Sequence, residues 1–185
     1  MAPKESLRFR YTLEQGYDTS CGMSVVATAL DLYWGEPATE TGIITATLGG
    51  AVDSGLYTVS LADMAAAFAA YGVAARAFKL DWEGLNAVVA KGYSPIVVHY
   101  ERPERHFALL LGFKGGRAVT ADPARGLESL SREAFETRYS GSAMALASKA
   151  LSVDGALVDR AVAEAAGRHE RLESAASRFA LRAGR

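Results

Sequence analysis

The sequence predicts an α+β domain, because helical patterns dominate the first half of the chain and strand patterns dominate the second. From residue 94 onward, short β-branched or apolar runs alternate with turn residues, which is typical of antiparallel strands. With 185 residues, half of them hydrophobic, the chain can bury one proper core. We expect a main domain over residues 1–152 and a helical extension over residues 153–185.

Four helices are expected before the main run of strands, each with residues that favour its ends. Ser20 or Thr19 can cap the first helix, and Gly35 stops it. The third helix begins at a capping-box-like segment from Ser60 to Asp63. The expected helices cover residues 20–34, 39–48, 60–71 and 81–91.

The expected strands are short and are separated by turn residues. They cover residues 73–80, 94–100, 107–113, 117–121 and 144–151, with a further helix at 131–139. The Lys-Gly-Gly segment at 114–116 is a hairpin loop signal. If all three residues belong to the loop, Phe113 pairs with Arg117 and Ala108 pairs with Asp122. A two-residue loop would break this register.

Residues 154–185 predict one long helix, because the segment lacks proline and is rich in Ala, Glu and Arg. Apolar and small residues recur there at alternating steps of four and three, which gives a heptad-like seam. The favoured interpretation is a helix docked on its own domain or on a partner. A coiled-coil dimer through residues 154–182 is the alternative, although three of the seven seam positions are Ala or His.

Composition argues against several classes of function. A net charge of −1 and a pI of about 6.3 give no electrostatic footprint for nucleic acid. One cysteine excludes an internal disulfide, and three histidines without metal-type spacing argue against a metal site; no cofactor is implied. No segment approaches the ~18 apolar residues of a transmembrane span. Without a secretory signal the protein is expected to be cytoplasmic, or periplasmic if an export signal has been removed.

Cys21 lies where a polar loop meets a long apolar helix. The first turn of a helix offers unpaired backbone N–H groups and a positive dipole end, which favour a thiolate. Gln15, six residues upstream, is positioned to donate its amide to an oxyanion formed when the thiol attacks a carbonyl. Since a lone cysteine near a helix start is often only a small buried hydrophobe, a catalytic role requires a base.

His106 is the expected base, because it begins an apolar strand just after a charged loop. Asp122 ends the next strand, before Pro123, and in the predicted register it lies diagonal to His106 on one sheet face. Diagonal neighbours are ~7–8 Å apart at the backbone, which side chains can bridge. A thiol, an imidazole and a carboxylate in this arrangement predict a nucleophile, a base and an orienting acid. His99 and His169 are expected to be structural.

This ordered set resembles the C39 family of papain-like cysteine peptidases, which includes the bacteriocin-processing domains of ABC transporters. In that family a glutamine precedes the nucleophile at the spacing seen between Gln15 and Cys21. The base opens a His-Phe/Tyr-Val-Val strand, as His106 does, and the third residue lies in an Asp-Pro…Gly segment, as Asp122 does. The glutamine, the cysteine, the histidine and the aspartate follow one another in the family's order.

The resemblance covers about residues 8–145. It is strongest to stand-alone proteobacterial members without transporter domains, which share the Gly-Tyr-Asp-x-Ser-Cys-Gly motif found here at residues 16–22. Ser20 stands where many transporter-linked members have Asp. The helical extension lies outside the resemblance.

The resemblance implies a papain-like fold and a cysteine endopeptidase with a Cys21–His106–Asp122 triad and an oxyanion hole that includes Gln15. The implied substrate is a peptide or protein cleaved after small residues, such as the Gly-Gly leader or pro-segment of an exported polypeptide. One alternative is a peptide-binding or secretion-accessory module in which cleavage has been lost. Another keeps the triad but transfers the acyl group to an amine other than water.

Overall fold

The computed structural model describes residues 8–16, 21–48 and 59–183. The helices of this part of the chain are α2 (Cys21–Thr28), the π-helix η1 (Ala29–Tyr33), α3 (Glu40–Leu48), α4 (Leu61–Ala70), α5 (Trp82–Ala90), α6 (Arg132–Arg138) and α7 (Gly155–Ala183). The strands are β1 (Ala74–Lys79), β2 (Ile96–Tyr100), β3 (His106–Lys114), β4 (Arg117–Asp122), β5 (Gly126–Ser131) and β6 (Tyr139–Ala147).

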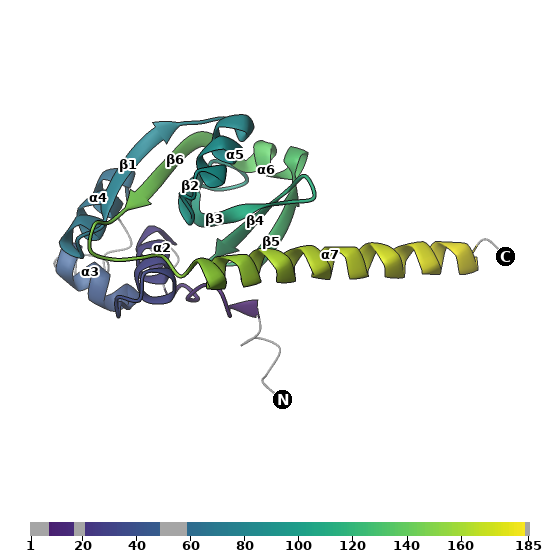
Figure 1. Cartoon of the computed structure of the whole chain (residues 1–185), viewed down its shortest axis with the longest axis horizontal. Coiled ribbons are helices and arrows are strands. Elements are labelled where there is room, and N and C mark those ends of the chain that lie inside the picture. The colour runs from purple at the N-terminus through teal and green to yellow at the C-terminus, as the bar shows by residue number, and fades with distance from the viewer. Residues whose placement is uncertain (1–7, 17–20, 49–58, 184–185) are drawn as a thin grey trace.

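The strands form one sheet in the order β1-β6-β2-β3-β4-β5, and every neighbouring pair is antiparallel. Helices cover both faces of this sheet (Figure 1). α2, α3, α4 and the start of α7 pack on one face, whereas α5 and α6 pack on the other. The expected α+β arrangement, with helices on an antiparallel sheet, is confirmed.

The helix that begins at Cys21 is wrapped in apolar side chains. In α2, every residue after Cys21 is buried, and the chain continues through the π-turn of η1 to Tyr33. The predicted helix at 20–34 therefore corresponds to α2 and η1 together. Its expected caps, Ser20 and Thr19, lie outside the described residues. The burial fixes the helix start against the sheet, where the thiol is displayed.

Two helix caps lie as predicted. Ser60 and Asp63 form a reciprocal capping box at the start of α4, with the Ser60 N–H donating to Asp63 Oδ2 at 2.9 Å. Asp81 caps α5 by accepting from the Gly84 N–H at 2.8 Å. These bonds satisfy backbone donors that have no partner inside the helix.

The sheet also departs from the sequence prediction. No strand was predicted at β5, whose Gly-Leu-Glu-Ser-Leu-Ser stretch is short and half polar. The last strand was predicted at 144–151, but β6 begins at Tyr139 and ends at Ala147. Its first half, Tyr-Ser-Gly-Ser, carries too few β-branched or apolar residues to indicate a strand.

The β3–β4 hairpin has the predicted register near Asp122, but its loop length and a bulge were not predicted. Its loop has two residues, Gly115 and Gly116, because Lys114 pairs with Arg117; the predicted pairing of Phe113 with Arg117 is therefore wrong. A bulge then adds Leu111 to β3, and beyond it Leu109 pairs with Ala121. The extra residue cancels the shift made by the shorter loop.

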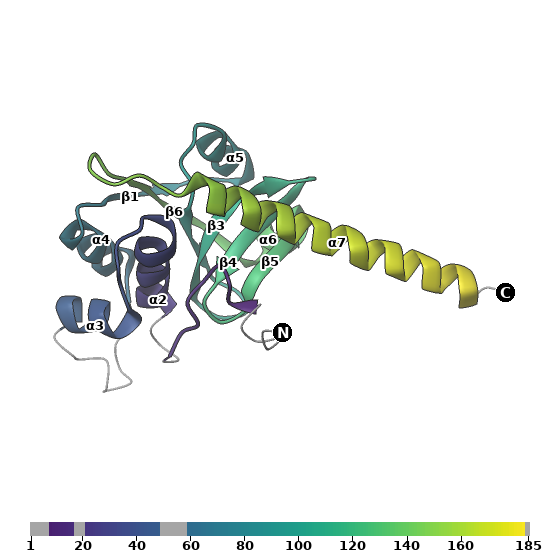
Figure 2. The same ribbon diagram turned by 60° about the horizontal axis from the view of Figure 1, so that its bottom comes forward.

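α7 belongs to the core only at its beginning. Val158, Ala161 and Ala165 are buried against the sheet and η1, and Tyr11 Oη donates to Glu164 Oε2 at 2.8 Å. Figure 2 shows the helix crossing the sheet and extending far beyond it. Among the described residues, no helix has the length and apolarity needed to cross a membrane.

Further along α7, the seam predicted from the heptad pattern is open to solvent. Leu172 is 64% exposed and Phe179 is 76% exposed. The predicted docking of the helix on its own domain therefore applies to its first part.

Replacing Ala161 with Asp is expected to destabilise the protein by about 3–5 kcal/mol, because it buries a carboxylate without a partner. The matched change Ala175→Asp, on the exposed part of the same helix, should cost less than about 1 kcal/mol. Urea unfolding monitored by circular dichroism measures both. Equal losses would contradict the division of α7 into a docked and an exposed part.

Candidate active site

Cys21 is half-buried at the first residue of α2. The following residue, Gly22, is packed so closely that an added Cβ would lie 2.6 Å from Val59 Cγ1. A larger side chain would force Val59 or the start of α2 to move. Because Gly22 has no side chain, the start of α2 can pack directly against Val59. Cys21 and Val59 both line the same cleft.

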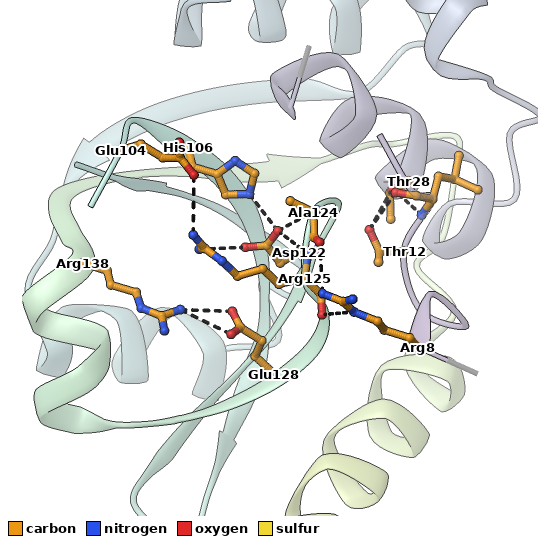
Figure 3. A network of polar contacts seen from close by, with 11 residues as sticks. Arg8, Thr12, Thr28, Glu104, His106, Asp122, Ala124, Arg125, Glu128 and Arg138 are labelled. Atoms are coloured by element: carbon orange, nitrogen blue, oxygen red, sulfur yellow. Dashed lines mark hydrogen bonds and ion pairs between the residues drawn. The ribbon is translucent and has the colours of Figure 1, made fainter. Parts of the chain in front are cut away.

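The structure brings His106 and Asp122 into direct contact. The His106 Nε2 to Asp122 Oδ1 distance is 2.7 Å, and both side chains are almost fully buried. In Figure 3, Asp122 lies between the His106 ring and the Arg125 side chain. The Leu109–Ala121 register places the two residues at adjacent strand ends, as predicted from the sequence.

Cys21 lies close enough to the His106 side chain to act on its pKa. Because Nε2 is occupied by Asp122, Nδ1 is the ring nitrogen left for the thiol. Burial lowers the pKa of His106, but the hydrogen bonds and charges of Asp122 and Cys21 outweigh it and raise the pKa from 6.5 to about 9. The ring is therefore protonated at neutral pH, and a positive charge lies beside the sulfur.

Asp122 is anchored by the turn that follows it. Its Oδ1 accepts the backbone N–H groups of Ala124 at 2.8 Å and Arg125 at 3.1 Å. Its Oδ2 has no hydrogen bond in the described part of the chain but lies 3.6 Å from Arg125 Nη1. This set of donors compensates a fully buried carboxylate and fixes its orientation toward the imidazole.

A further arginine holds this turn from outside. Arg8 Nε donates to the carbonyl of Arg125 at 3.0 Å, and Arg8 Nη2 donates to that of Ala124 at 3.2 Å (Figure 3). Gly126 has a φ of +77°, and a Cβ there would collide with the backbone of Arg8. No local pattern in the sequence marked Arg125, and Arg8 is over a hundred residues from the turn that it contacts.

Gln15 is connected to the same turn through its backbone. Its N–H donates to the carbonyl of Pro123 at 3.1 Å. Two residues upstream, the Leu13 N–H donates to Thr28 Oγ1 at 3.0 Å, which ties this segment to α2. The Gln15 side chain is half-buried, and its Oε1 has no hydrogen-bond partner among the described residues. Residues 17–20, which join Gln15 to Cys21, lie outside them.

A cleft of about 740 Å³ opens beside Cys21. Its floor includes His99 of β2, for which a structural role was predicted from the sequence. His99 Nδ1 lies 2.8 Å from Ser140 Oγ, and burial lowers the pKa of the ring. His99 therefore has a structural contact and also faces the cleft, which alternation along an apolar strand could have indicated.

His169 is remote from this cleft. It lies on α7, where its Nε2 is 3.0 Å from Glu173 Oε1 one helical turn away. Within the described ranges, no cluster of three His, Cys, Asp or Glu side chains is placed to hold a metal ion. Cys21 lines the cleft, and His106 and the buried Asp122 lie behind it.

We expect an NMR titration to place the pKa of His106 near 9 and that of His99 below 6.5. Asp122→Asn should lower the pKa of His106, because the ring loses a charged acceptor. Glu104→Gln, an exposed charge change that also contacts Arg125, is the control and should have little effect.

Since the folded-state pKa of His106 is raised, its contribution to stability should be full below about pH 6.5 and lost as the pH rises through about 9. A His106 pKa that stays unchanged in Asp122→Asn would contradict the assigned contact.

Comparisons with known proteins identify relatives of this chain. Residues 10–150 match the model of the peptidase C39 family. The chain is 28% identical over 137 residues to the probable functional amyloid protease FapD of Pseudomonas aeruginosa strain PAO1, covering 72% of this chain and 59% of that protein. The chain thus spans a little over half the length of that relative.

Two solved structures share the fold. The peptidase domain of Streptococcus ComA, a bifunctional ABC transporter of a quorum-sensing pathway, has a TM-score of 0.62 at 18% identity and covers 75% of this chain and 99% of that one. A double glycine motif protease from an AMS/PCAT transporter has a TM-score of 0.56 at 23% identity and covers 73% and 89%. The expected papain-like fold is confirmed. On the family match over most of its length, this chain belongs to the peptidase C39 family of cysteine peptidases.

Proposed function

We propose that this protein is a cysteine endopeptidase in which Cys21 is the nucleophile, His106 the general acid and base, and Asp122 the orienting acid. The observation that carries the proposal is the placement of His106, whose ring bonds Asp122 at 2.7 Å and whose pKa is raised by both Asp122 and Cys21. A histidine held in this way has a fixed orientation and a stabilised positive charge.

In the proposed reaction, the thiolate of Cys21 attacks the carbonyl carbon of the scissile peptide bond, and His106 holds the proton. The carbonyl oxygen becomes an oxyanion that accepts hydrogen bonds from the Gln15 amide and the Cys21 N–H. His106 then gives its proton to the leaving amine, and the C–N bond breaks. Water, deprotonated by His106, hydrolyses the thioester that remains.

The proposed substrate is the leader or pro-segment of an exported polypeptide, cleaved after small residues of the Gly-Gly type. Support comes from the relatives: one solved neighbour is a double glycine motif protease in complex with its leader peptide.

We further propose that residues 1–152 form the peptidase domain and residues 153–185 an extension that contacts a partner. The exposed seam residues Leu172 and Phe179 support contact of this extension with a partner.

The same exposed residues also favour a second candidate function, a peptide-binding or secretion-accessory module in which cleavage has been lost. Turnover distinguishes the two functions.

The test uses quenched fluorescent decapeptides with a central Gly-Gly, and mass spectrometry identifies the products. We expect cleavage after Gly-Gly, poor cleavage of the Leu-Leu analogue, no turnover by Cys21→Ala, and a loss of about 10³-fold or more in His106→Ala. His169→Ala is the matched control and should retain activity. Binding without turnover by the wild type would favour the accessory module, and transfer to an added amine would indicate acyl transfer.

Gln15→Ala is expected to lower kcat by about 10²–10³-fold, because one oxyanion donor is lost. The alkylation rate of Cys21 should stay unchanged, since the thiol and its base are intact. Glu14→Ala, at the neighbouring exposed position, controls for disturbance of the segment. A kcat for Gln15→Ala within twofold of the wild type would exclude it from the oxyanion hole.

A further inference from the structure

The floor of the cleft crosses several strands. From the strand that carries His106, it continues over Phe107 of β3, His99 of β2, Ser140 and Ser142 of β6, and Lys79 of β1. These strands are neighbours in the order β3-β2-β6-β1. The side chains on this floor are mostly polar, unlike the apolar pockets that bind apolar ligands.

The distance across the floor sets the length of peptide that fits it. Neighbouring strands lie ~4.8 Å apart, so the three steps from β3 to β1 span about 14 Å. An extended peptide advances ~3.3 Å per residue, and about four residues cover that span. A substrate lying across the floor with its scissile bond at Cys21 would thus bring a residue three to five positions away to Lys79.

The charges that line the cleft favour an anion at that end. Lys79 Nζ donates to Ser142 Oγ at 2.7 Å, and in the described part of the chain neither Lys79 nor Arg105 has a carboxylate within ion-pair distance. Glu101 is the acidic residue among those that line the cleft. Burial lowers the pKa of His99, so this ring adds no charge at neutral pH. The cleft is therefore lined by two cationic side chains, Lys79 and Arg105, and one anionic side chain, Glu101.

We propose that this cleft selects polypeptide substrates carrying an aspartate or glutamate three to five residues from the scissile bond, which pairs with Lys79. Arg105, at the opposite end of the floor beside His106, adds to the same positive potential. The inference rests on the proposed peptidase function, to which it adds a substrate class. Because Lys79 and Arg105 are exposed, the preference is moderate and weakens at high salt.

The test is a positional scan of Gly-Gly decapeptides, with one Asp or Asn placed at each position on both sides of the scissile bond. Asp should be favoured over Asn by about fivefold in kcat/KM at one or two positions three to five residues away on one side. Lys79→Glu should abolish or reverse this preference, and a Lys at that position should then be favoured.

Arg76→Glu provides the matched control. It makes a similar charge change on the same strand, but Arg76 lies on the opposite face of β1, where its guanidinium stacks on Phe78. The substrate preference should stay unchanged in this variant. A wild type that cleaves Asp and Asn peptides equally at every position would overturn the inference while leaving the peptidase function intact.

A binding measurement keeps the inference testable without turnover. Fluorescence polarisation with Cys21→Ala should show tighter binding of the favoured Asp peptide than of its Asn analogue. The double variant Cys21→Ala/Lys79→Glu should lose this difference. If the wild type cleaves none of the peptides but Cys21→Ala binds with this selectivity, the peptidase proposal fails and the charge selection stands. Equal binding of both peptides would overturn the charge selection.

Discussion

The hydrogen bond between His106 and Asp122 is the contact on which the rest of the site depends. At 2.7 Å, it fixes the ring plane, leaves Nδ1 for Cys21 and outweighs the burial that would otherwise keep the ring neutral. The buried carboxylate is stable there because backbone N–H groups and Arg125 also contact it. Without that compensation, a charge at 0% exposure would be strongly destabilising.

Two parts of the fold position the His106–Asp122 contact, the β3–β4 pairing and the turn after Asp122. The β3–β4 pairing places His106 and Asp122 at adjacent strand ends, and the bulge at Leu111 keeps them in register despite a two-residue loop. The turn after Asp122 also accepts the Gln15 N–H through Pro123. The segments that carry His106, Asp122 and Gln15 therefore meet at one turn, and the start of α2 brings the Cys21 thiol close to them.

Much of this arrangement could be predicted from the sequence, because its signals are local. Helix caps such as Asp81 and the strand opened by His106 follow from short patterns. The strand β5, the early start of β6 and the bulge at Leu111 could not be predicted, since tertiary pairing overrides weak strand propensity there. The clamp by Arg8 joins positions over a hundred residues apart, and only the folded chain reveals it.

Activation of the Cys21 thiol by His106 can be measured as the rate of alkylation by iodoacetamide as a function of pH. Since the chain has a single cysteine, every adduct reports this site. Near pH 6, the wild type should react about tenfold or more faster than His106→Ala, with Asp122→Asn in between. Equal rates in all three proteins would contradict a thiol activated by a histidine that Asp122 holds in place.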